Sequence, residues 1–126
     1  MNTTEKIVQK QLDSYNARNL EPYLECFSDD VQVFSFPSGE MTYSGKDKLR
    51  DIYADIFEQS PNLHCELLNR IVFDNKVIDH ESVTGRKGVD VTEIVAIYEI
   101  ENGLIAKAHF MPVSYTHLTL PTICSV

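Results

Sequence analysis

The apolar residues of this chain recur with two different periods, helical in the first half and mostly alternating in the second. Three segments of the first half carry apolar residues three or four positions apart, which predicts amphipathic helices. These segments are residues 3–19, 20–27 and 46–60. Thr3 or Thr4 is the expected N-cap of the first helix and Asn19 that of the second. Ser60-Pro61-Asn62 is expected to end the third.

Strand-like patterns occupy the rest of the chain. Between the second and third helices, an alternating run and a turn predict a short hairpin. In the second half, two long apolar-rich runs meet at a polar turn of the kind that favours a long hairpin. A further run ends in Asn102-Gly103, which is a strong hairpin signal. The expected strands are residues 31–36, 41–43, 63–73, 77–86, 90–101 and 104–111.

This order predicts an α+β fold, in which three N-terminal helices pack on a strongly curved, mainly antiparallel sheet. The length of 126 residues fits one domain. The long hairpin is expected to supply both the core and the wall of any binding pocket. We place the domain at residues 1–111.

Residues 112–126 differ in character, because they contain no acidic residue, lysine or arginine in a chain that is otherwise 24% charged. The segment resembles translated read-through of a sequencing adapter, and we interpret it as an artefactual tail that should be left out of fold reasoning. A genuine C-terminal extension is the alternative. Tyr115, His117 and Cys124 therefore receive no functional role.

The net charge of −8 argues against binding to nucleic acid or to an anionic membrane surface. No apolar run reaches the length of a membrane span, and the N-terminus lacks a secretory pattern. The spacing of the three cysteines, Cys26, Cys65 and Cys124, is not typical of a metal site or of an even set of disulfides. We therefore expect a reduced cytoplasmic protein with no cofactor and no metal.

Several short segments resemble the SnoaL-like branch of the nuclear transport factor two-like superfamily, which includes ketosteroid isomerase. They are residues 15–20 (YNARNL), 27–31 (FSDDV), 43–46 (YSGK), 69–72 (NRIV) and 75–81 (NKVIDHE). They also resemble short bacterial proteins that are called steroid delta-isomerase-like by family. The resemblance implies a cone-shaped fold that encloses an apolar pocket, and an outer sheet face that often pairs two subunits.

The resemblance does not supply the catalytic carboxylates of ketosteroid isomerase, which are an aspartate base and a protonated aspartate that donates to the oxyanion. Phe36 stands before Pro37 where the base is required, Ala96 occupies our placement of the oxyanion aspartate, and Gln11 stands near the helical tyrosine. An Asp-Arg-Asp epoxide-hydrolase arrangement also occurs in the superfamily. Arg70 and Asp79 fit two of its members, but no spacing singles them out.

His80 and Tyr15 are the candidate catalytic residues. Histidine titrates near neutral pH and serves as acid or base, and Tyr15 lies one turn after Gln11. A partner for His80 has to come from across the sheet, with His64 and Glu66 as candidates. The alternatives are a hydrogen-bonded sheet histidine without chemistry and a core tyrosine.

Seven further residues are expected to line the pocket: Phe34, Phe36, Tyr53, Phe57, Ile94, Ala96 and Tyr98. If Ala96 faces inward, strand alternation places Thr92, Ile94 and Tyr98 on the same wall. The aromatic rings either line a cavity for a flat ligand or fill it completely as a packed core.

The same alternation places Val95 and Ile97 on the outer sheet face, which favours a homodimer contact. Coverage by the tail or by local curvature is the alternative. The sequence thus predicts a protein that binds a small apolar or amphipathic molecule in the cone and acts as an isomerase, cyclase or hydratase. A non-catalytic ligand-binding or protein-interaction domain is the competing interpretation.

Overall fold

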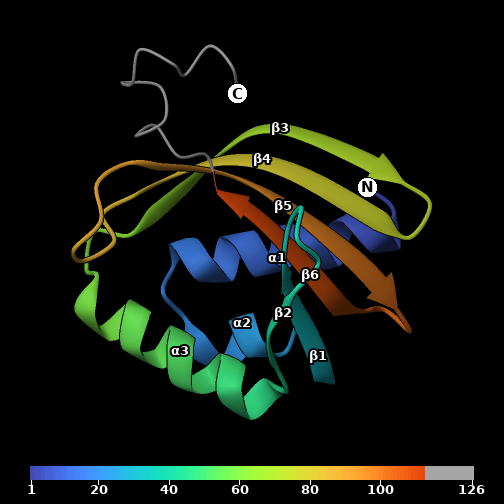
Figure 1. The fold of residues 1–126 in the computed structure, drawn as a ribbon, viewed down its shortest axis with the longest axis horizontal. Helices are drawn as coiled ribbons and strands as arrows, with labels where there is room; N and C mark the ends of the chain where they lie inside the picture. Colours follow the sequence, from blue (N-terminus) through green and yellow to red (C-terminus); the bar gives the residue numbers. More distant parts are fainter. Residues whose placement is uncertain (113–126) are drawn as a thin grey trace.

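The computed structural model describes residues 1–112, and Figure 1 shows their arrangement. The elements in chain order are α1 (Thr3–Asn16), α2 (Leu20–Leu24), β1 (Phe27–Ser35), β2 (Met41–Ser44), α3 (Lys46–Gln59), β3 (His64–Phe73), β4 (Lys76–Thr84), β5 (Thr92–Glu101) and β6 (Leu104–Pro112). We interpreted residues 112–126 as a tail. Of these, residues 113–126 lie outside the described residues.

The six strands form one sheet in the order β2-β1-β6-β5-β4-β3. All neighbouring pairs are antiparallel except β1 and β6, which run parallel. The sheet arches over α1, with α3 at one end (Figure 1). The predicted α+β fold, with three N-terminal helices on a curved and mainly antiparallel sheet, is confirmed.

The boundaries in the first half differ from the sequence-based expectation. The side chain of Asn2, and not that of Thr3 or Thr4, caps α1 by accepting a hydrogen bond from the Glu5 backbone N–H at 2.8 Å. The second helix ends at Leu24, and β1 begins at Phe27 instead of residue 31. Phe27 pairs with Ile105 of β6, and the Ile105 backbone N–H donates to the carbonyl of Cys26. The polar residues 28–30 lie in a register shift between this pair and the next pair, Gln32 with Lys107.

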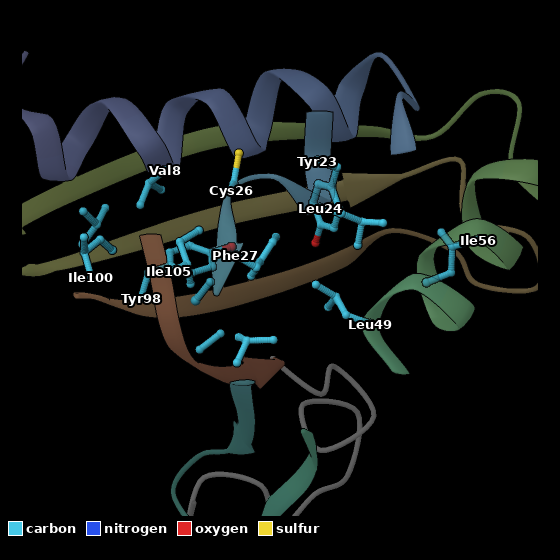
Figure 2. Close-up of a cluster of buried hydrophobic side chains, with 14 of the residues drawn as sticks. Val8, Tyr23, Leu24, Cys26, Phe27, Leu49, Ile56, Tyr98, Ile100 and Ile105 are labelled. Carbon is cyan, nitrogen blue, oxygen red and sulfur yellow. The ribbon is translucent and has the colours of Figure 1, made fainter. Parts of the chain in front are cut away.

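The core lies between α1, α3 and the inner face of the sheet. Figure 2 shows that Val8 from α1 approaches the strand residues, while Leu49 and Ile56 reach in from α3. Tyr98 and Ile105 are almost completely buried there. Removal of these apolar side chains from water is the main stabilising contribution to such a fold.

Candidate functional site

A cavity of about 260 Å³ lies between α1, α3 and the inner face of β4 and β5. Its wall combines apolar side chains with hydroxyl, amide, thiol, carboxyl and guanidinium groups. The lining residues are Gln11, Leu12, Tyr15, Tyr23, Tyr53, Cys65, Glu81, Val83, Arg86, Thr92, Ile94, Tyr98 and Phe110. Ligand pockets commonly measure about 300–1,000 Å³, so this cavity suits a small molecule.

The cavity has an open end and a closed end. Arg86 is exposed and Thr92 is partly exposed, and both lie where the β4–β5 loop enters β5. Gln11 and Tyr98, in contrast, are 5% and 2% exposed. A ligand would therefore enter beside the β4–β5 loop and extend toward α1.

Glu81 is the buried carboxyl group of the cavity. Alternation along β4 turns Val77, Asp79, Glu81 and Val83 to the inner face, and Glu81 is 5% exposed. Burial, followed by the nearby charge of Asp79, raises the pKa of Glu81 from 4.5 to about 7. A carboxyl group with such a pKa can accept or release a proton near neutral pH.

Two weaker influences oppose this rise in the pKa of Glu81. The thiol of Cys65 hydrogen-bonds to the carboxyl group, and the positive charge of Arg70 lies nearby. Asn16 fixes the backbone of Cys65 on both sides, since its amide donates to the Cys65 carbonyl at 3.0 Å and its oxygen accepts from the Cys65 N–H at 2.7 Å. The C-terminal turn of α1 thereby holds the start of β3 against the cavity.

Asp79 lies two residues before Glu81 and is completely buried. Arg70 from β3 binds it through two hydrogen bonds of 2.7 and 2.9 Å, and Gln9 of α1 accepts a further one from the same guanidinium at 2.7 Å. The Glu5 carboxylate lies 3.6 Å from Arg70. This ion pair joins β3, β4 and α1, and it places a fixed negative charge near Glu81.

Tyrosine side chains form another wall of the cavity. Burial raises the pKa of Tyr53, and its side-chain hydrogen bonds with Tyr23 and Tyr43 only partly oppose this rise, so its hydroxyl stays protonated at neutral pH. Burial raises the pKa of Tyr15, which therefore also remains a protonated donor.

The structure places His80 on the outer face of the sheet, away from the cavity. Its neighbours Asp79 and Glu81 face inward, and its Nε2 lies 2.7 Å from a carboxylate oxygen of Glu93 on β5. Neither His64 nor Glu66 is this partner. The hydrogen-bonded sheet histidine is therefore the arrangement observed, whereas Tyr15 does line the cavity.

Of the seven expected lining residues, Tyr53, Ile94 and Tyr98 face the cavity. Phe34 instead stacks on His109 on the outer face, with ring centroids 4.7 Å apart, because its strand position faces away from the helices. Phe36 is 44% exposed just beyond the end of β1. Phe57 and Ala96 point inward but are buried in the core instead of bordering the cavity.

Sequence reasoning did not place Glu81, Gln11 or Arg86 at the cavity. A signal for Glu81 was present, since Val77 and Val83 share its strand face and are apolar. Gln11 interrupts the apolar face of the first helix, which was a second signal. Arg86 follows a glycine in a loop, and no periodic pattern indicates where a loop side chain points.

Among residues 1–112, no cluster of histidine, cysteine, aspartate or glutamate side chains could hold a metal ion. Within the same range, no helix is both long and apolar enough to span a membrane.

The described fold defines a class of proteins in which a bent sheet encloses a cavity over an N-terminal helix. The SnoaL-like domain family matches residues 8–108. The chain therefore belongs to the SnoaL-like family. A comparison with curated proteins gives no significant match.

Solved structures with the same fold are numerous. An uncharacterised cystatin-fold protein from Novosphingobium aromaticivorans has a TM-score of 0.76 and 23% identity, over 87% of this chain and 97% of its own. A provisionally assigned ketosteroid isomerase from Kribbella flavida has a TM-score of 0.76 and 14% identity, with coverage of 89% and 78%. A provisionally assigned polyketide cyclase from Sinorhizobium meliloti has a TM-score of 0.70 and 18% identity, with coverage of 87% and 99%. At these identities the likeness establishes the fold alone.

Proposed function

We propose that this protein binds a small carbonyl compound in the cavity and moves a proton on it, with Glu81 as general base. The observation that carries this proposal is the buried Glu81 carboxyl group, whose pKa of about 7 allows it to exchange a proton at neutral pH. Enzymes of provisional isomerase and cyclase assignment share the fold, which is compatible with such chemistry but does not establish it.

The proton transfer needs two groups that the cavity provides. The Glu81 carboxylate removes a proton from the carbon next to the carbonyl. The electron pair of that C–H bond forms a carbon–carbon double bond, and the π pair of the carbonyl moves to its oxygen. Tyr53 or Tyr15 donates a hydrogen bond to the resulting enolate oxygen, which stabilises the developing charge. Return of the proton to another carbon gives isomerisation, and attack of the enolate carbon on a second carbonyl gives cyclisation.

Deuterium exchange tests this chemistry without knowledge of the natural substrate. The protein is incubated in D₂O with phenylacetone, and loss of the signal from the hydrogens next to the carbonyl is followed by proton NMR. Glu81→Gln should lower the protein-dependent exchange rate by at least about 100-fold, because general-base catalysis commonly contributes that much.

The matched control is Glu66→Gln, which removes the same charge from an exposed carboxylate on β3. This variant should exchange as fast as wild type. Equal exchange by wild type and Glu81→Gln, or no exchange above buffer by wild type, would contradict the proposal. The second outcome would favour a protein that binds its ligand without chemistry.

We also propose that the outer sheet face forms a homodimer. Paired positions on five adjacent strands align in one outer-face row, which consists of Ile71, Ile78, Ile97, His109 and Phe34. Ile71 is 59% exposed in the single chain. Charged groups border the row on one side, where Glu99 pairs with Lys76 and Lys107. An apolar centre with a polar rim is typical of protein interfaces.

Ile97→Asp is expected to convert this dimer into a monomer, because it places a charge at the centre of the outer-face row. Analytical ultracentrifugation should give twice the chain mass for wild type and the chain mass for the variant. Val91→Asp is the control, since Val91 is 60% exposed but lies in the β4–β5 loop, and it should remain dimeric. A monomeric wild type would contradict the interface.

A cytoplasmic location remains our expectation. Cys26 and Cys65 are free and buried, and Cys124 lies outside the described residues. Free thiols are the usual state in reducing compartments, which supports this expectation.

A further inference from the structure

We propose that the ligand carries an acidic group that binds Arg86 and, at its far end, a hydrogen-bond donor that binds Gln11. This inference deepens the proposed function, because it concerns the same cavity and names the class of ligand. The chemical class is a small carbonyl compound with an apolar body, a carboxylate at one end and a hydroxyl or N–H at the other. Two independent observations, one at each end of the cavity, carry it.

The first observation concerns Gln11 at the closed end. Its side chain is 5% exposed, and its Oε1 atom is completely buried without a hydrogen-bond partner in the described part of the chain. A buried acceptor without a partner costs about 1–3 kcal/mol, which a donor on a bound ligand would recover. Gln11 lines the cavity, so a rotation of its side-chain amide would bring this acceptor to a ligand hydroxyl or N–H.

The second observation concerns Arg86 at the open end. The guanidinium borders the cavity, and no carboxylate of residues 1–112 forms an ion pair with it. The buried arginine of the fold, Arg70, in contrast has Asp79 as its partner. The net charge of the chain is −8, yet Arg86 has no acidic partner within residues 1–112. Its guanidinium can therefore bind an anionic ligand at the mouth of the cavity.

The loop that carries Arg86 is fixed on both sides of this residue. Gly85 has a φ of +78°, and a Cβ atom there would lie 2.0 Å from the Asn62 carbonyl oxygen, so the two backbones are in direct contact. The Lys87 N–H donates to Ser60 Oγ at 3.1 Å, and its Nζ donates to Gln59 at 2.8 Å. Lys87 is thus directed to α3, while Arg86 is presented to the cavity.

Between the two ends, the carboxyl group of Glu81 disfavours a second acidic group beside it, so the favoured place for the acid is the mouth near Arg86. Glu81 is the acidic residue of the lining, and the tyrosine hydroxyls are donors. Leu12, Ile94 and Phe110 supply apolar surface along the way. A ligand with a carboxylate at the mouth keeps that charge away from Glu81 while its apolar body passes the tyrosines.

Three matched probes test this assignment by isothermal titration calorimetry. They are 3-(4-hydroxyphenyl)propanoate, 3-phenylpropanoate, which lacks the hydroxyl, and 3-(4-hydroxyphenyl)propan-1-ol, which lacks the carboxylate. Wild type should bind the hydroxy acid about tenfold more tightly than either other probe, since each lost contact is worth roughly one strong hydrogen bond.

One variant should lose the preference for the carboxylate and keep that for the hydroxyl, and the other variant should do the reverse. Arg86→Gln should bind the hydroxy acid and the alcohol equally, and Gln11→Met should bind the hydroxy acid and 3-phenylpropanoate equally. Lys87→Gln changes the charge of the same loop by the same amount and should keep both preferences. Arg86 is exposed, so its variant should fold even if Gln11→Met does not.

Equal binding of all three probes by wild type, or no binding of any, would overturn the inference. Unchanged discrimination in Arg86→Gln would also overturn it. None of these results would contradict the proposed function. That function is tested by the deuterium exchange of phenylacetone, which depends on Glu81 and requires neither an acidic group nor a hydroxyl on the ligand.

Discussion

Glu81→Gln is expected to be about 3 kcal/mol more stable than wild type at pH 8, although it removes the proposed catalytic group. In the folded state the pKa of Glu81 is raised to about 7, whereas 4.5 is its ordinary value. The folded protein therefore holds the proton more tightly than the unfolded chain does. The contribution of Glu81 to the free energy of unfolding is fully present below pH 4.5 and is lost as pH rises through about 7. The difference between the two pKa values sets the size of this contribution.

Urea unfolding of both proteins between pH 5 and pH 8 measures this effect. The free energy of unfolding of wild type minus that of the variant should fall steadily across this range and level off above pH 7. Glu66→Gln provides the comparison, because its exposed carboxylate should give a flat difference. A flat difference for Glu81→Gln as well would contradict the burial of an ionisable carboxyl group in the cavity.

Arg70→Leu is expected to destabilise the protein by about 3–5 kcal/mol, because it leaves the completely buried Asp79 without its ion-pair partner. Urea unfolding at pH 7 measures this loss of stability, with circular dichroism to verify the fold.

Two further variants separate the ion pair from other effects of the substitution. The double variant Arg70→Met with Asp79→Leu should recover most of the loss, since it removes both charges together. Arg50→Leu breaks the exposed pair with Glu21 and should change stability little. A loss from Arg70→Leu no greater than that from Arg50→Leu would show that Asp79 does not depend on its partner.

The sequence predicted the fold well because its signals were periodic. The helical spacing of the segment that forms α1, the alternation in β5 and the Asn102-Gly103 turn each depend on local geometry that the sequence determines directly. The start of β1 was missed because residues 28–30 are polar and do not alternate, whereas the pairing that begins the strand joins Phe27 to Ile105 of the distant β6.

The candidate site was predicted less well, because a site depends on which face a residue occupies. His80 was favoured because a histidine side chain ordinarily titrates near neutral pH. In the structure, burial raises the pKa of the neighbouring Glu81 to about 7. Phe34 and Phe36 were chosen for their aromatic character, yet the parallel pairing of β1 with β6 turns Phe34 outward. Tyr53, Ile94 and Tyr98 line the cavity, and each lies on a regular helix or strand pattern.

The central claim is that the cavity holds a carboxyl group that exchanges its proton near neutral pH. The most direct measurement is a carbon-13 NMR titration of the side-chain carboxyl groups, in which the Glu81 signal is identified by its absence from Glu81→Gln. The account predicts a titration midpoint near pH 7. A midpoint near the ordinary value of 4.5 would contradict it, because Glu81 would then be a permanently ionised and solvated residue without the properties of a general base.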